Sequence, residues 1–194
     1  MCSSDLPVYH QIREKEGLIS NRINTIIRDI EENIWIGGKQ GIIQALPPAF
    51  EFLNQSNGTP FEMSYAIVLD KSNNLWVCSE TGLFRGIQDN SGQYVWENIS
   101  SKLKLKENFI SLFSDPAGEI WAGTYGSGVY RIMPASLNYT RYNAPGLIND
   151  NNVISITGKD NYVWLSTLGG GVSCYDMEKS AFLQFRHSEL MNSY

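Results

Sequence analysis

Few residues in this sequence have the types and spacing that catalysis requires. The two histidines, His10 and His187, lie close to the two ends, so the sequence does not favour a Ser-His-Asp triad. The segments Gly123–Gly128 and Gly169–Gly171 are similar to phosphate-binding loops, but neither is followed by the Lys-Ser/Thr pair and the helix that such loops need. We interpret both segments as hairpins in which glycine supplies positive φ angles.

Three aspartates recur at a fixed distance from a tryptophan, and this spacing favours a structural role over acid–base catalysis. Asp29, Asp70 and Asp115 each stand six residues before a Trp. In a turn between two strands, a carboxylate can accept hydrogen bonds from backbone amides. We therefore interpret these three residues as turn formers.

The cysteines and histidines predict neither a metal site nor a cofactor. Cys2, Cys78 and Cys174 have no CxxC spacing, and two histidines give little basis for a Cys/His site. Cys78 and Cys174 lie within apolar runs, which favours buried free thiols; a disulfide is the alternative.

Tryptophan also sets the period of the sequence. Trp35, Trp76, Trp121 and Trp164 are 41, 45 and 43 residues apart, and the residues around them recur. A period in the low forties with strand-like segments predicts a β-propeller with one blade per repeat. The alternative is a β-sandwich with accidental Trp spacing, but the Asp, Trp, small-residue and Gly positions keep a common register, which favours the propeller.

Each repeat is predicted to form four antiparallel strands. The second strand holds the Trp, and a glycine-containing hairpin leads to the third. The first strands are expected at residues 23–28, 64–69, 109–114 and 153–157. The fourth strands are expected at residues 50–53, 94–96, 139–142 and 182–185.

Small residues recur where the innermost strands converge on the propeller axis and larger side chains would crowd, while each Trp has the size to fill the wedge between two sheets. The small residues of the first strands are Thr25, Ala66, Ser111 and Ser155. The small residues that stand two positions after each Trp are Gly37, Cys78, Gly123 and Ser166. The fourth repeat departs from the pattern, because Lys159 stands where the other repeats have an aspartate.

The repeats predict an all-β chain that is part of a larger propeller ring. Residues 1–6 (MCSSDL) match the translated end of a sequencing adapter and are expected to be a non-native leader; a coincidental N-terminus is the alternative. Residues 7–16 are expected to form the outer strand of a preceding blade, and residues 188–194 to begin a further blade. The four predicted blades span residues 17–54, 55–99, 100–143 and 144–187.

Side chains that vary between repeats are the candidates for ligand recognition, since the constant positions build the blade. The fourth residue after each Trp varies in this way: in successive repeats it is Lys39, Glu80, Tyr125 and Leu168. It lies in the hairpin between the second and third strands, on the same rim as the segments that precede the first strands. The cationic, anionic, amide and aromatic groups there suit a hydroxyl-rich sugar, with Tyr125 as a stacking surface. The candidate ligand-binding residues are Arg22, Lys39, Glu80, Asn108, Tyr125 and Asn152.

The segment GLISNRINTIIRDIEENIWIGGKQGI, residues 17–42, resembles the two-component regulator propeller repeat. The third and fourth repeats carry the same pattern around Trp121 and Trp164. Departures include Gly38, where threonine is usual, and Cys78, where glycine is usual. The resemblance implies seven-bladed propellers in the periplasmic part of a hybrid two-component sensor, followed by an immunoglobulin-like domain, a membrane helix and a histidine kinase.

The resemblance further implies that this chain senses a ligand, an oligosaccharide in many such receptors, and that it catalyses nothing itself. Two alternatives remain, a fragment of a propeller lyase or hydrolase and a scaffold for protein interactions. A lyase would need an acid–base group on the rim, and no repeat loop contains a histidine.

The composition and net charge of the chain limit the kinds of partner that it is expected to bind. With 42% hydrophobic and 18% charged residues, the 194-residue chain has enough apolar material for a core. A net charge of −5 argues against nucleic acid and anionic membrane surfaces, and the apolar runs are too short to cross a bilayer. The expected partners are an oligosaccharide or other small ligand, the remaining blades of the parent chain, and a second parent chain in a homodimer.

Overall fold

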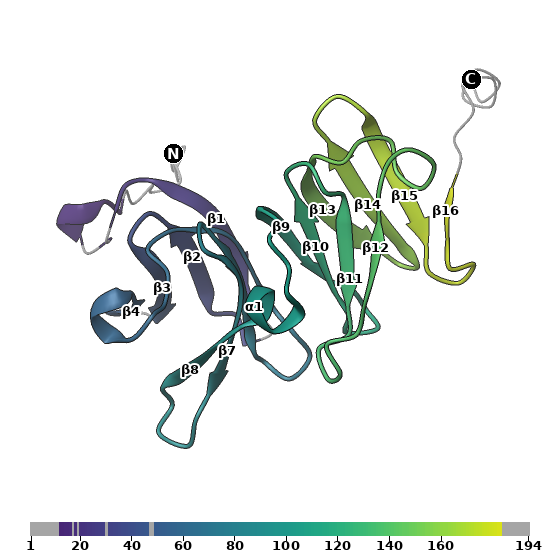
Figure 1. Cartoon of the computed structure of the whole chain (residues 1–194). Coiled ribbons are helices and arrows are strands. Elements are labelled where there is room, and N and C mark those ends of the chain that lie inside the picture. Colours follow the sequence, from purple (N-terminus) through teal and green to yellow (C-terminus); the bar gives the residue numbers. More distant parts are fainter. Residues whose placement is uncertain (1–11, 17, 19, 30, 47–48, 184–194) are drawn as a thin grey trace, which may run out of the picture.

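The computed structural model describes residues 12–183 apart from residues 17, 19, 30 and 47–48. Within these residues, sixteen strands form four antiparallel sheets, each of four strands in chain order (Figure 1). The expected leader and the start of a further blade lie outside the described residues. So does most of the expected outer-strand segment at residues 7–16; within it, the described Glu14–Glu16 form a 3-10 turn (η1).

Each sheet is one blade. Blade 1 contains β1 (Ile23–Arg28), β2 (Ile34–Gly38), β3 (Gly41–Leu46) and β4 (Ala49–Leu53). Blade 2 contains β5 (Ser64–Leu69), β6 (Leu75–Ser79), β7 (Gly82–Gln88) and β8 (Tyr94–Asn98). Blade 3 contains β9 (Phe109–Ser114), β10 (Ile120–Thr124), β11 (Val129–Ile132) and β12 (Tyr139–Tyr142). Blade 4 contains β13 (Val153–Lys159), β14 (Tyr162–Thr167), β15 (Gly171–Asp176) and β16 (Ala181–Leu183).

The predicted four-stranded blades are confirmed, but the sequence did not predict the helical turns between them. A short helix, α1 (Ile99–Leu103), follows β8, because the Asn98 side chain accepts a hydrogen bond from the Ser101 amide at 2.8 Å and Ile99 is buried. A 3-10 turn, η2 (Gln55–Asn57), follows β4 and is capped in the same way by Asn54. Both turns belong to the connections that carry the chain from one blade to the next.

The four blades follow one another along an arc, with their first strands side by side (Figure 1). β1 contacts β5, β5 contacts β9, and β9 contacts β13. Every first strand also has a β-bulge near its start, where one residue has no partner on the second strand. The bulged residues are Asn24, Tyr65, Ile110 and Ile154.

The hydrophobic core lies between the blades, in three clusters. Trp35 packs against blade 2, Trp76 against blade 3, and Trp121 against blade 4. Small residues allow this close approach: a Cβ added to Gly37 would come within 2.7 Å of the Ser64 hydroxyl of blade 2. The Trp and small-residue columns therefore hold consecutive blades together.

Blade 4 exposes the face that the other blades bury. Trp164 is 36% exposed and Val172 is 50% exposed, whereas the corresponding Trp121 and Val129 of blade 3 are both 0% exposed. At the other end of the arc, Ile26 is 63% exposed. Its counterparts in the later blades, Ile67, Leu112 and Ile156, pack against the preceding blade. The outer faces of blades 1 and 4 thus lack the neighbour that each inner face has within the described chain.

These two apolar faces predict that the 194-residue chain alone self-associates in solution. Sedimentation velocity over a concentration series is expected to show oligomers or aggregates, and charging both faces with Ile26→Lys and Val172→Lys is expected to reduce them. Met133→Lys changes an equally apolar, exposed residue on a loop and serves as the control. A monodisperse chain with a high, cooperative melting transition would contradict the prediction.

Candidate functional site

The structure brings the variable hairpin residues against the segments that precede the first strands. In three blades, the amide of the fourth residue after the Trp donates to the carbonyl of the residue just before the first strand. These bonds join Lys39 to Arg22 (3.1 Å), Tyr125 to Asn108 (2.9 Å) and Leu168 to Asn152 (3.0 Å). We call this side of the arc the hairpin rim; five of the six predicted ligand-binding residues take part in these bonds.

In blade 2, a side chain in place of a backbone amide joins the hairpin to the segment before the first strand. Both carboxylate oxygens of Glu80 accept backbone hydrogen bonds, from the Glu62 amide at 2.6 Å and from the Met63 amide at 2.9 Å. Met63 in turn forms a β-bridge with Lys39 of blade 1. Glu80 is exposed, but its carboxylate is held in place by the segment that leads into β5.

Tyr125 projects from a hairpin whose backbone is fixed on both sides. It is 57% exposed. The Thr124 hydroxyl donates to the Gly128 carbonyl at 2.8 Å, and the Gly126 and Gly128 amides donate to the Asn151 carbonyl. Because the two glycines have positive φ and their amides are engaged, the segment forms a hairpin, as predicted, and offers no phosphate cradle.

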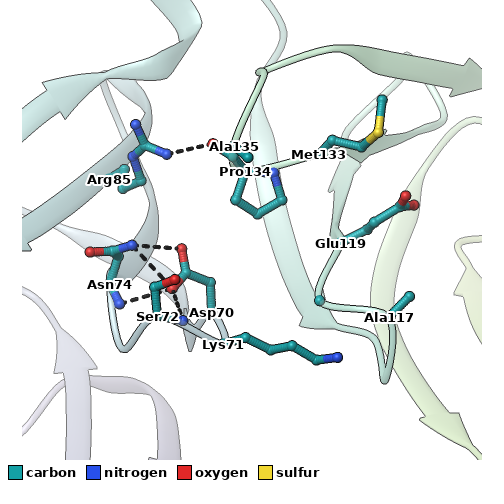
Figure 2. A pocket seen from close by; sticks show the side chains of 11 residues that line it. Asp70, Lys71, Ser72, Asn74, Arg85, Ala117, Glu119, Met133, Pro134 and Ala135 are labelled. Carbon is teal, nitrogen blue, oxygen red and sulfur yellow. Dashed lines mark hydrogen bonds between the residues drawn. The ribbon is translucent and has the colours of Figure 1, made fainter.

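Two grooves open between blades 2 and 3, at opposite ends of the strands. The first, of about 300 Å³, lies on the hairpin rim, and Glu80 and Asn108 are among its lining residues. The second, of about 400 Å³, lies among the turns on the opposite rim (Figure 2). There Arg85 donates to the Pro134 carbonyl at 2.7 Å and pairs with Glu97, so its guanidinium joins blade 2 to blade 3.

The turn aspartates have a second partner that the sequence did not reveal. One oxygen of Asp70 accepts the Ser72 and Asn74 amides, while the other accepts the indole N–H of Trp76 at 2.9 Å. The same Asp–Trp bond occurs in two further blades. It joins Asp29 to Trp35 at 2.8 Å and Asp115 to Trp121 at 2.9 Å.

The environment of Asp29 keeps its carboxyl ionised. Burial raises the pKa, but hydrogen bonds from the Trp35 indole, the Asn33 amides and the Glu31 amide outweigh burial and hold the pKa below its usual range. The carboxylate is therefore a permanent acceptor at neutral pH, which suits a structural role.

Cys78 and Cys174 are buried free thiols, as predicted, and burial raises the pKa of the Cys78 thiol well above its usual value. Among the described residues, no group of three or more His, Cys, Asp or Glu side chains could hold a metal ion. No helix in that part of the chain is long and apolar enough to cross a membrane.

The β1–β2 segment carries the pattern of a known repeat. Residues 17–40 match the family model described as two component regulator propeller. The match covers the first two strands of blade 1. Within the matched segment, the Asp29–Trp35 pair closes the turn between these strands, and Gly37 permits contact with the next blade. No curated protein matches the sequence.

Solved structures show where the fold recurs. The extracellular domain of the hybrid two component system BT3049 from B. thetaiotaomicron matches with a TM-score of 0.70 and 16% identity, over 92% of this chain and 26% of that chain. The extracellular domain of the hybrid two component system BT4673 from the same organism matches with a TM-score of 0.63 and 22% identity, over 81% of this chain and 22% of that chain. Virginiamycin B lyase from Staphylococcus aureus matches with a TM-score of 0.63 and 16% identity, over 85% and 55%.

At these identities, the similarity shows a common propeller fold. The chain spans about a quarter of the length of the two-component domains and just over half of the lyase.

Proposed function

We propose that this chain is a ligand-sensing propeller segment of a periplasmic receptor in a two-component system, and that its ligand is an oligosaccharide. The observation that carries the proposal is the hairpin rim. Side chains that differ between repeats gather there on a backbone that is hydrogen-bonded in the same way in three blades. Such a rim can vary its contacts without disturbing the Asp, Trp and glycine positions that build the blades.

The proposal assigns ligand contacts to Arg22, Lys39, Glu80, Asn108, Tyr125 and Asn152. The phenol ring of Tyr125 is exposed enough to stack on a sugar, and the amide, cationic and anionic groups can bond to hydroxyls. Further blades of the parent chain would cover the outer faces of blades 1 and 4 and complete a ring of about seven, the ring size that the repeat implies. A homodimer of the parent is a further expectation, with no contact to nucleic acid or membrane by this segment.

Tyr125→Ala and Lys39→Ala test the assignment in the complete receptor that contains this chain. Each is expected to weaken binding of the recognised oligosaccharide about tenfold, equivalent to about 1.4 kcal/mol, measured by titration calorimetry. Lys71→Ala, on the opposite rim, is the control and is expected to leave the affinity unchanged. Unchanged affinity in both rim variants would remove these residues from the site.

A propeller lyase is the second candidate, because virginiamycin B lyase shares the fold. A lyase would place an acid–base group on the hairpin rim, and the described hairpins contain no histidine. The parent gene separates the candidates: a membrane helix and a kinase downstream of these blades support the receptor, and their absence would defeat it. A scaffold for protein partners would show neither saccharide binding nor catalysis.

A further inference from the structure

We propose that the groove between blades 2 and 3 on the hairpin rim is a subsite for one sugar ring, with Tyr65 as its stacking surface. The proposal rests on the proposed function and adds Tyr65, Lys106 and Glu107 to the candidate residues. The groove is formed by the hairpin Ser79–Gly82, by Tyr65 and by the segment Leu105–Asn108 that leads into β9. Its volume of about 300 Å³ is at the lower end of the range for small-ligand pockets, about 300–1,000 Å³.

The β-bulge in β5 sets Tyr65 apart from its strand neighbours. Ser64 pairs with Ser79 and Ala66 pairs with Cys78, which leaves Tyr65 without a cross-strand partner. One part of its side chain packs on the core between blades 2 and 3, and the residue also lines the groove. The equivalent bulged residues of the other blades are not aromatic, so this feature distinguishes the groove from the rest of the rim.

Several polar groups of the groove are already engaged within the protein. The Ser79 hydroxyl donates to the Gly82 carbonyl at 3.0 Å, and the Ser100 hydroxyl accepts from the Leu83 amide at 2.9 Å. These bonds fix the wall of the groove before any ligand arrives, which lowers the entropy cost of binding.

Other polar groups remain available to a ligand. The Tyr65 hydroxyl, the Lys106 ammonium and the Asn108 side-chain amide have no hydrogen-bond or charged partner among the described residues. Together they provide both donors and acceptors, which is what a ring of hydroxyl groups requires.

Glu107 is positioned as an acceptor. Its carboxylate accepts the Lys106 amide at 2.8 Å. Burial and the nearby Glu107 raise the pKa of Tyr130, so the hydroxyl beside this carboxylate stays protonated at neutral pH. A carboxylate has lone pairs for more than the one amide donor, so it can also accept from a sugar hydroxyl.

The charges of the groove favour a neutral ligand. Lys106 brings one positive charge, while Glu80 and Glu107 bring two negative charges, so neither a polyanion nor a polycation would be strongly attracted. An aromatic ring with mixed hydrogen-bonding groups around it suits a pyranose, which has an apolar face and a rim of hydroxyls.

The test measures binding of four neutral probes, maltohexaose, cellohexaose, xylohexaose and mannohexaose, to the complete receptor by titration calorimetry. Tyr65→Ala and Glu107→Gln are each expected to lower the affinity for the probe that the parent binds at least tenfold. Tyr65→Phe keeps the ring and is expected to stay within about threefold of the parent. Lys71→Ala lies in the groove of the opposite rim and is expected to change nothing (Figure 2).

The outcomes separate the subsite from the broader proposal. If a probe binds and both Tyr65→Ala and Glu107→Gln keep the parent affinity, the subsite is overturned while saccharide sensing stands. If no probe binds, recognition of neutral hexose and pentose oligomers is overturned, and the subsite with it. Melting temperatures of all variants identify any loss of affinity that comes from unfolding. In that case the difference in affinity between Tyr65→Phe and Tyr65→Ala, measured below the lower of their melting temperatures, decides whether the ring of Tyr65 contributes to binding.

Discussion

Replacement of Trp121 by alanine is expected to lower the free energy of unfolding of the 194-residue chain by about 3–5 kcal/mol, the cost of truncating a large buried aromatic side chain. Trp121 is fully buried between blades 3 and 4. Its ring stacks on Tyr142 with centroids 5.8 Å apart and meets the ring of Tyr175 edge-on at 5.1 Å. Alanine would remove both contacts and leave a cavity where two blades meet.

Trp164→Ala is the matched comparison, because Trp164 occupies the same position of its repeat but is 36% exposed. Its loss is expected to be about 1–2 kcal/mol, since part of the side chain is already in water. Urea unfolding followed by circular dichroism at low protein concentration measures both variants. If further blades cover blade 4 in the parent chain, the Trp164→Ala loss should rise there toward that of Trp121→Ala. Equal losses in the 194-residue chain would contradict the argument.

Asp115→Asn is expected to destabilise the chain by about 2–3 kcal/mol, because it disturbs charge-assisted hydrogen bonds inside the protein. Asp115 is buried and accepts the Glu119 amide and the Trp121 indole N–H, both at 2.9 Å. An asparagine has one acceptor oxygen, so its NH₂ group would face one of these two donors.

Asp89→Asn is the control for Asp115→Asn. Asp89 is exposed and accepts the Ser91 and Gln93 amides in the turn between β7 and β8, but it has no Trp partner. Its substitution is expected to have a much smaller effect on the urea midpoint. If the two substitutions cost the same, the Trp bond contributes nothing and the turn alone explains the aspartate.

The spacing of Asp, Trp and glycine was enough to predict the blades and the starts of their first strands. β1, β5 and β9 have the predicted bounds, and β13 continues two residues further, to Lys159. These positions are predictable because each depends on the few residues around it, a turn, a hairpin and an alternating strand. α1 was not predicted, since a five-residue helix held by one cap and one buried side chain gives no periodic pattern.

The candidate site was predictable only in part. The sequence indicated which hairpin residues vary, and the structure places them against the residues before the first strands. It did not indicate that the Glu80 carboxylate caps two backbone amides, nor that Tyr65 lines a groove. The signal that could have pointed to Tyr65 is weak: it is the only aromatic residue among the second positions of the first strands.

The sequence by itself determined the repeat, the four-stranded blade and the residues that build it, because those features depend on local spacing along the chain. Only the tertiary structure decided which of these residues are buried and which grooves exist, since both depend on contacts between blades. Trp121 and Trp164 show the difference. They stand at the same position of the repeat, yet blade 4 covers the first, and no blade within the described residues covers the second.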